Sequence, residues 1–292
     1  WSLGMMPGLV SYLRREQPDV LIARLLTMPA VIGKMLAKSP TRLIISMSGL
    51  PRHSTYRDFL WPRVHTHADG FVAPAESVAR YSADMIGIPR ERFHIIPNPV
   101  LDDETLERAE EPVDHPWFNV PEHPVVIAVG RLTRQKDFPT LFRAFARVRE
   151  QIPARLMILG EGEDRADLTR LASELDLTPD LFMPGHVLSP LGYMKAADVF
   201  VMSSEWEGPG HVLIEAQAVG TPAVSTDCPA GPRETLLNGE AGMLVPVGGE
   251  VAMATAITKM LMDRETALTM AGMGLEHIDR FYPANVASKW SA

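Results

Sequence analysis

Two glutamates flank a glycine-rich turn in the segment SSEWEGPGHVLIEAQAVGTP, residues 203–222. Glu207 precedes the turn, and Glu215 lies on the second turn of the apolar helical pattern that follows it. Gly208 and Gly210 allow a ligand to approach the backbone closely. Together with the helix dipole, the unpaired backbone N–H groups at a helix start predict an anion site that suits a diphosphate. Here these groups belong to Gly210, His211 and Val212.

The two carboxylates suit different parts of one ligand. The carboxylate of Glu215 can accept two hydrogen bonds from a vicinal diol such as a ribose, at a position beyond the bound phosphates. Glu207 is placed on the other side of the diphosphate site. Two simpler interpretations stay open: Glu215 is an exposed helix acid, and Glu207 only complements the positive end of the helix dipole.

A second loop, GRLTRQKD, supplies complementary cations. Arg131 and Lys136 follow an apolar strand pattern, where a cation is costly unless it meets an anion. Arginine offers a planar fork that matches phosphate oxygens, and lysine adds a compact charge. Two solvated loop cations are the alternative. A sugar joined through a diphosphate to a nucleoside accounts for both loops, whereas the simpler interpretations explain each loop separately.

The elements that must position these loops alternate between strand and helix. Before residue 105, strands are expected at 19–23, 42–46, 70–74 and 93–100, and helices at 29–38 and 76–86. After a proline-rich stretch, strands are expected at 125–130, 155–160, 181–185, 198–204, 222–227 and 242–246, and helices at 138–150, 164–175, 190–197, 211–219 and 231–237. Strands that are apolar on both faces predict a doubly wound α/β protein with parallel sheets.

This alternation predicts one complete doubly wound domain, preceded by part of another. The partial domain covers residues 1–105, a linker covers 106–122, and the complete domain covers 123–270. In such sheets, ligands bind beyond the carboxyl ends of the strands, at the point where the strand order reverses. Both chemically notable loops directly follow expected strands of the complete domain.

Composition narrows the class of protein. The chain has 292 residues and a net charge of −8, with +2 in residues 1–105 and −10 in residues 106–292, which argues against nucleic acid as a partner. The single cysteine, Cys228, excludes an internal disulfide framework and favours a reducing, cytoplasmic compartment. No uncharged apolar run is long enough to span a membrane. His65 and His67 have metal-like spacing, but a surface pair is the simpler interpretation.

Four segments together carry a resemblance to a known family: VGRLTRQKDFPTLFRAFARV, LMILGEGEDRADLTRLA, GHVLSPLGYMKAADVFVMSSEWEGPGHVLIEAQAVGTPAVSTDCPAGPRETL and GMLVPVGG. They resemble the donor-binding domain of retaining glycosyltransferases with the GT-B fold, the fourth family of the glycosyltransferase classification. The resemblance implies two Rossmann-like domains with parallel sheets, the first of them incomplete. It also implies that residues 271–292 form a C-terminal helix that crosses back to the first domain.

The resemblance implies a role for each motif residue. Glu207 would face the donor sugar, Glu215 would bind the ribose hydroxyls, and Arg131 and Lys136 would neutralise the diphosphate. The base edge would lie against Gly185, His186 and Val187. The implied donor is a nucleotide-diphosphate sugar with UDP as the expected nucleotide, and the implied acceptor is a glycan or a lipid-linked glycan. Because no Asp-x-Asp pair follows a strand, neither a metal nor another cofactor is expected.

The sequence also departs from the family pattern. Pro209 supplies no N–H where the family has another residue, and no counterpart of the family's opening strand and glycine-rich loop is found, which predicts N-terminal truncation. Met47 and Ser48 stand where a histidine is usual, with His53 downstream. Alternatives are another GT-B enzyme, such as a sugar-nucleotide epimerase or a phosphorylase, and an inactive nucleotide-binding remnant. Peripheral contact of the first domain with the inner face of a membrane is a further expectation.

Overall fold

The computed structural model describes residues 4–50, 55–120 and 122–291. The chain divides into two compact units, with the boundary between Pro97 and Asn98. The predicted first domain ran to residue 105. His53, the suggested substitute histidine, lies outside the described residues.

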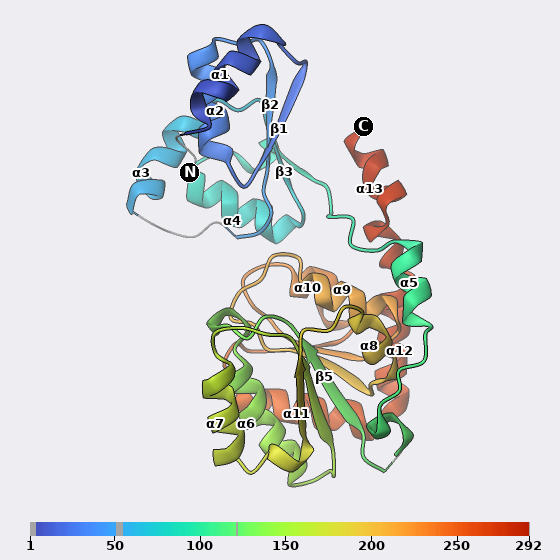
Figure 1. Cartoon of the computed structure of the whole chain (residues 1–292). Helices are drawn as coiled ribbons and strands as arrows, with labels where there is room; N and C mark the ends of the chain where they lie inside the picture. Colours follow the sequence, from blue (N-terminus) through green and yellow to red (C-terminus); the bar gives the residue numbers. More distant parts are fainter. Residues whose placement is uncertain (1–3, 51–54, 121, 292) are drawn as a thin grey trace. The chain divides into compact units, whose positions relative to one another are not determined.

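The first unit is a parallel four-stranded sheet in the order β1-β2-β3-β4. Helices lie beside this sheet (Figure 1). The strands are β1 (Val20–Arg24), β2 (Arg42–Ser46), β3 (Gly70–Ala73) and β4 (Phe93–Ile95), and the helices are α1 (Met6–Arg15), α2 (Thr27–Ala37), α3 (Thr55–Val64) and α4 (Glu76–Ile86), with short 3-10 turns at His65–His67 and Arg90–Arg92. The expected strands are therefore present, although β4 is much shorter than the predicted 93–100.

His65 is a core residue of the first unit, so the interpretation of His65 and His67 as a surface pair was wrong for His65. Its side chain is fully buried, whereas His67 is exposed. The ring nitrogens of His65 lie 3.1 Å from the carbonyl of Trp61 and 3.3 Å from the hydroxyl of Thr27. Desolvation lowers the pKa of His65, and the contact with Trp61 partly opposes that shift. These contacts join α2 to the end of α3.

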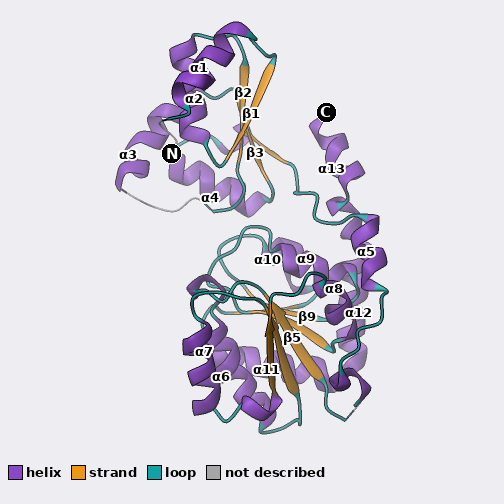
Figure 2. Cartoon of the chain, viewed as in Figure 1, coloured by secondary structure: helices purple, strands orange, loops and turns teal. Residues whose placement is uncertain are grey.

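The second unit is a parallel six-stranded sheet in the order β10-β9-β8-β5-β6-β7, with helices on both faces (Figure 2). The strands are β5 (Val125–Val129), β6 (Arg155–Leu159), β7 (Leu181–Gly185), β8 (Val199–Met202), β9 (Ala223–Thr226) and β10 (Met243–Val245). The helices are α5 (Asp103–Ala109), α6 (Phe138–Arg149), α7 (Arg165–Glu174), α8 (Pro190–Ala196), α9 (His211–Ala218), α10 (Pro232–Thr235), α11 (Glu250–Met262), α12 (Arg264–Glu276) and α13 (Pro283–Trp290).

Alternate residues of each central strand enter two separate cores, as expected for a sheet that is covered on both faces. Val126 and Ala128 of β5 pack with Phe142 and Phe145 of α6. Ile127 of the same strand packs in the opposite core, which also contains residues of α8 and α9. The sequence prediction of a doubly wound parallel α/β domain is confirmed.

The order of the strands reverses between β5 and β8. From β5 the chain builds β6 and β7 on one side, and then returns to place β8, β9 and β10 on the other. The loops after the neighbouring strands β5 and β8 therefore lead to opposite sides of the sheet. Doubly wound sheets bind ligands at this position. These are the loops that carry Arg131, Lys136 and Glu207.

The expected linker contains regular structure that the proline-based prediction missed. Helix α5 ends inside it, and a 3-10 turn covers Pro116–Asn119. The side chain of Asp102 caps α5 by accepting a hydrogen bond of 2.7 Å from the N–H of Thr105. At the far end of the chain, the expected boundary at residue 270 falls within α12. The crossing of the C-terminal helix to the first domain stays a prediction.

Candidate active site at the carboxyl ends of strands β5 and β8

Hydrogen bonds to backbone carbonyls join the loop after β5 to the loop after β8. The N–H of Glu205 donates to the carbonyl of Gln135 at 2.9 Å, and the side chain of Gln135 donates to the carbonyl of Trp206 at 2.9 Å. The hydroxyl of Ser203 donates to the carbonyl of Lys136 at 2.7 Å. Because two loops distant in sequence hold each other, their backbones are kept side by side at the switch point.

A buried ion pair lies at the centre of this junction. The ammonium of Lys136 contacts Oε1 of Glu207, and the side chains are only 15% and 10% exposed respectively. The hydroxyl of Ser204 donates to the same oxygen at 2.7 Å. Such a pair costs desolvation of both charges, which close contact and an additional hydrogen bond offset. The sequence predicted a role for each residue toward a ligand, but it did not predict that they contact each other.

Arg131 provides a second cation at the start of the same loop. Its side chain is exposed, and it forms no hydrogen bond or ion pair with any residue in the described part of the chain. Gly130 precedes it, and a Cβ at Gly130 would lie 3.1 Å from Cε of Lys136. The missing side chain at Gly130 thus leaves room for the lysine stem. Because the side chain of Arg131 has no internal partner in the described part of the chain, it can pair with an incoming anion without first breaking a contact.

Helix α9 begins at His211, shortly after Glu207 of the Lys136–Glu207 ion pair. Gly210 adopts a left-handed conformation with φ of +72°, which glycine tolerates, and it directly precedes His211. The first backbone N–H of the helix to donate within it is that of Leu213, which bonds to the carbonyl of Gly210 at 2.9 Å. The N–H groups of His211 and Val212 precede that bond in the chain, at the start of the helix.

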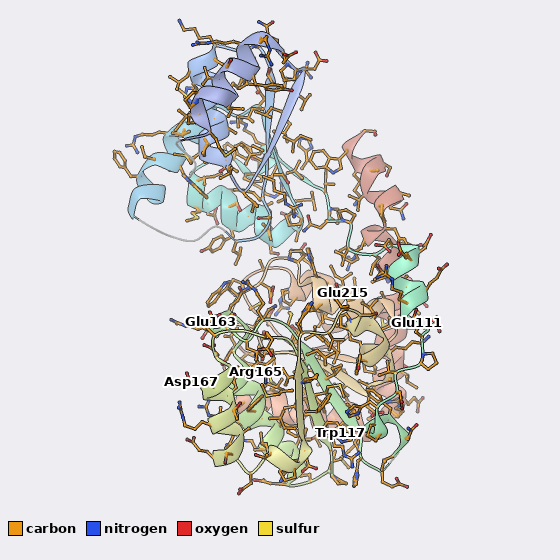
Figure 3. All side chains as sticks on the ribbon, viewed as in Figure 1. Glu111, Trp117, Glu163, Arg165, Asp167 and Glu215 are labelled. Carbon is orange, nitrogen blue, oxygen red and sulfur yellow. The ribbon has the colours of Figure 1, made fainter. Side chains whose placement is uncertain are left out.

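Glu215 lies on α9 (Figure 3). The side chain is partly buried, and desolvation raises the pKa of this carboxyl, while the charge of Lys136 acts in the opposite direction. The interpretation of Glu215 as an exposed helix acid is therefore wrong. Lys136 therefore pairs directly with Glu207, and its charge also acts on the carboxyl of Glu215.

The residues predicted for the base lie farther along the sheet. Gly185 ends β7, the strand that is separated from β5 by β6. It has φ of +98°, and its carbonyl accepts a hydrogen bond of 2.8 Å from the N–H of Gly160. His186 is exposed, whereas Val187 packs on the core. The predicted set therefore spreads along one edge of the sheet, from β8 to β7.

The segment GEGED, residues 160–164, forms the start of the loop after β6. A Cβ at Gly160 would lie 1.9 Å from the carbonyl oxygen of Gly130, and one at Gly162 would lie 2.2 Å from that of Leu132. The N–H of Leu132 also donates to the carbonyl of Glu161 at 2.9 Å. These glycines are required because the loop after β6 packs directly on the loop after β5.

Two residues of one further segment, at and within helix α10, support the site, and neither was predicted from the sequence. Thr235 of α10 donates its hydroxyl to the carbonyl of Pro209 at 2.9 Å. A Cβ at Gly231 would lie 1.8 Å from the carbonyl oxygen of Gly208. Helix α10 therefore packs on the turn between the two glutamates. The only sequence signal was the Ala-Gly-Pro segment before α10, which is typical of a tight helix start.

Cys228 gives a prediction for the pH dependence of stability. Burial raises the pKa of this thiol to about 12, and the charge of Glu207 adds to the shift. The unfolded chain ionises near the ordinary value of 9.0 and so binds fewer protons than the folded chain above that pH. We expect Cys228 to lower the free energy of unfolding by about 1 kcal/mol between pH 9 and pH 10. Urea unfolding of the wild type and of Cys228→Ala at each pH measures this loss. If the free energy of unfolding changed with pH in parallel for the two proteins, the prediction would be contradicted.

Within the described ranges, no helix has the length and apolarity needed to cross a membrane. In the same ranges, no group of three or more His, Cys, Asp or Glu side chains is arranged to hold a metal ion.

The fold and the arrangement of charges define a doubly wound class of α/β protein, in which a parallel sheet carries cations and a helix N-terminus at its switch point. Comparison with known families identifies the family. Residues 113–274 match the family described as glycosyl transferases group 1, and residues 1–104 match Glycosyltransferase Family 4. Because the first match covers more than half of the chain, the chain belongs to the glycosyl transferases group 1 family.

Similar curated proteins carry glycosyltransferase names. The chain is 29% identical over 245 residues to an uncharacterized glycosyltransferase of Methanocaldococcus jannaschii, covering 78% of this chain and 60% of the relative. It is 36% identical over 166 residues to the lipopolysaccharide core biosynthesis glycosyltransferase LpsE of Rhizobium meliloti, covering 56% of this chain and 47% of the relative. The chain thus spans about half the length of these relatives.

Solved structures show the same fold. The structure of Anabaena HepE in complex with UDP and glucose has a TM-score of 0.83 at 17% identity, and the match covers 99% of this chain and 80% of that one. Sucrose-phosphate synthase from Thermosynechococcus elongatus has a TM-score of 0.81 at 22% identity, with 99% and 77% covered. These likenesses confirm the α/β fold with two parallel sheets that the sequence predicted.

Proposed function

We propose that this protein transfers a sugar from a nucleotide-diphosphate sugar to a glycan or lipid-linked glycan acceptor, with retention of configuration. The observation that carries the proposal is the arrangement of Lys136, Glu207 and the start of α9 at the switch point. It offers positive charge and backbone donors to a diphosphate, and a carboxylate on each side of that site. UDP is the proposed nucleotide, because HepE was solved with UDP.

The proposed chemistry follows from where charge develops. When the sugar–phosphate bond breaks, the leaving diphosphate gains negative charge and the sugar becomes oxocarbenium-like. Arg131, Lys136 and the N-terminus of α9 would stabilise the leaving group, so no metal is required in this scheme. Glu207 would orient the donor sugar, and Glu215 would bind the ribose hydroxyls. A phosphate oxygen of the leaving group can take the proton of the acceptor hydroxyl as that hydroxyl attacks the sugar.

The class of acceptor is proposed from the names of relatives. LpsE is named for lipopolysaccharide core biosynthesis. A protein of Campylobacter jejuni, 36% identical over 138 residues and covering 47% of this chain, is named as a transferase that acts on a diphospho-undecaprenol-linked sugar. An undecaprenol-linked acceptor carries a lipid chain that a membrane holds, so we propose that the protein acts in the cytoplasm at the inner face of the membrane.

A transfer assay tests this proposal. The protein is incubated with UDP-, GDP- and ADP-sugars and a membrane lipid extract, and labelled sugar is measured in the lipid and glycan fractions. We expect transfer from one nucleotide class, with the configuration at the anomeric carbon retained, and a large loss with Glu207→Gln. Release of free, epimerised sugar or of sugar phosphate without an acceptor would favour an epimerase or a phosphorylase instead. Nucleotide binding without turnover of any donor would support a binding remnant.

The roles of Glu215 and Arg131 can be separated by ligand. Glu215→Ala is expected to lower affinity for UDP and for uridine alike, by about tenfold, because both ligands lose an acceptor for the ribose hydroxyls. Arg131→Ala is expected to lower affinity for UDP by a similar factor and to leave affinity for uridine unchanged. Calorimetric titration measures all four values.

Arg143→Ala serves as the control for charge, because Arg143 is an exposed cation on α6, outside the loop junction. It is expected to leave both affinities unchanged. Equal losses for UDP and uridine in Arg131→Ala would contradict the assignment of Arg131 to the diphosphate.

A further inference from the structure

Ser204 is held on both sides in the loop after β8. Its side chain is fully buried, and its hydroxyl donates to Oε1 of Glu207. Its own carbonyl accepts a hydrogen bond of 2.7 Å from the hydroxyl of Thr226, the last residue of β9. The serine is therefore anchored to the sheet through its backbone while its side chain points at the carboxylate.

The geometry at Glu207 is asymmetric. One carboxylate oxygen, Oε1, receives both Ser204 and Lys136. Among the residues that the structure describes, the other oxygen has no hydrogen-bond partner. Two donors on one oxygen fix the plane of the carboxylate, because rotation about the last side-chain torsion would break both contacts. That torsion is otherwise broad and weakly restrained.

We propose that Ser204 is a positioning residue, which locks the carboxylate of Glu207 so that Lys136 is held at the switch point. The role in transfer rests on the proposed function, because a fixed ammonium next to the diphosphate needs no rearrangement when charge develops. Ser204 itself need not touch the donor. It acts on Lys136 through Glu207, three residues further along the chain.

A simpler role is structural, in which the hydrogen bond from the Ser204 hydroxyl to Glu207 only stabilises the backbone turn over residues 204–207. Both roles allow Ser204→Ala to lower stability. They differ in whether the effect on Lys136 requires Glu207. A turn would loosen Lys136 whether or not residue 207 carries a charge, whereas a positioning role disappears once the carboxylate is gone.

The test measures how fast the amine of Lys136 is acylated in the nucleotide-free protein. Trace labelling with acetic anhydride, followed by mass spectrometry of the peptide that contains Lys136, gives its rate relative to Lys259, which is remote on α11. An ammonium paired with a carboxylate must leave that partner and lose its proton before it reacts. We expect Glu207→Gln to raise the relative rate of Lys136 about tenfold and Ser204→Ala to raise it about fivefold.

The double variant Ser204→Ala/Glu207→Gln decides between the roles. If Ser204 acts through Glu207, Lys136 is acylated at the same rate in the double variant as in Glu207→Gln alone. Ser225→Ala is the matched control, because Ser225 is also a fully buried serine, but its hydroxyl donates to the backbone carbonyl of Thr226 at 3.0 Å. In this variant Lys136 is expected to be acylated at the wild-type rate. An unchanged rate in Ser204→Ala, or an added effect in the double variant, would overturn the proposal. Because no nucleotide is present, either result is independent of whether the protein transfers sugar.

Discussion

Replacing Lys136 by methionine is expected to lower sugar transfer about a hundredfold and the free energy of unfolding by about 3 kcal/mol. Methionine keeps most of the apolar stem, so the change mainly removes the charge. The carboxylate of Glu207, which is 90% buried, then loses its cation. The loss in transfer reflects the charge that the leaving diphosphate no longer meets. Urea unfolding and the transfer assay give the two values.

Two further variants separate the structural effect from the chemical one. Lys136→Met/Glu207→Gln removes both charges, so it is expected to recover most of the stability and none of the transfer. Lys195→Met breaks the ion pair with Glu110, whose side chains are 40% and 72% exposed, and is expected to change stability by less than about 1 kcal/mol. Wild-type transfer by the double variant would show that Lys136 has no role at the diphosphate.

Replacing Gly231 by alanine is expected to lower the free energy of unfolding by at least about 3 kcal/mol and to abolish nucleotide binding. The residue has φ of +86°, and an added Cβ would lie 1.8 Å from the carbonyl oxygen of Gly208. Backbone on both sides of the contact must move, and the displaced turn is the one that joins Glu207 to α9. Thermal unfolding and UDP titration measure the two effects.

Gly239 provides a control that also has a positive φ but no clash. Its φ is +102°, and no atom lies within 4 Å of an added Cβ. Gly239→Ala is therefore expected to cost about 1–2 kcal/mol, through the positive φ alone, and to leave UDP affinity unchanged. If the two variants were equally stable and bound UDP equally well, the close packing of α10 on the turn would not control the site.

The sequence predicted the strands better than the helices of the first unit. All ten expected strands are present. Short apolar runs bounded by turn residues are rarely compatible with another secondary structure. Helix α1 was not predicted, since Pro7 lies next to its start and no side chain caps it. Helix α3 was missed too, as it contains Pro62, and proline normally indicates a helix boundary.

The candidate site was predictable as a set of residues but not as a set of contacts. Arg131, Lys136, Glu207 and Glu215 follow from residue type and from their place after expected strands. The pairing of Lys136 with Glu207 does not, because it joins loops 71 residues apart. The same holds for the packing of Gly231 on Gly208, which depends on the close approach of two backbones. Sequence patterns report local periodicity and turn chemistry, whereas these contacts depend on the order of strands in the sheet.

The most direct test of the central claim, that the loops after β5 and β8 form a nucleotide-diphosphate site, is calorimetric titration of the folded protein with UDP, GDP and ADP. We expect one of these nucleotides to bind, with an affinity that falls as salt is added, because part of the binding is charge pairing. Lys136→Met should weaken that binding and reduce its dependence on salt. The absence of heat with all three nucleotides, in a sample shown to be folded, would contradict the account.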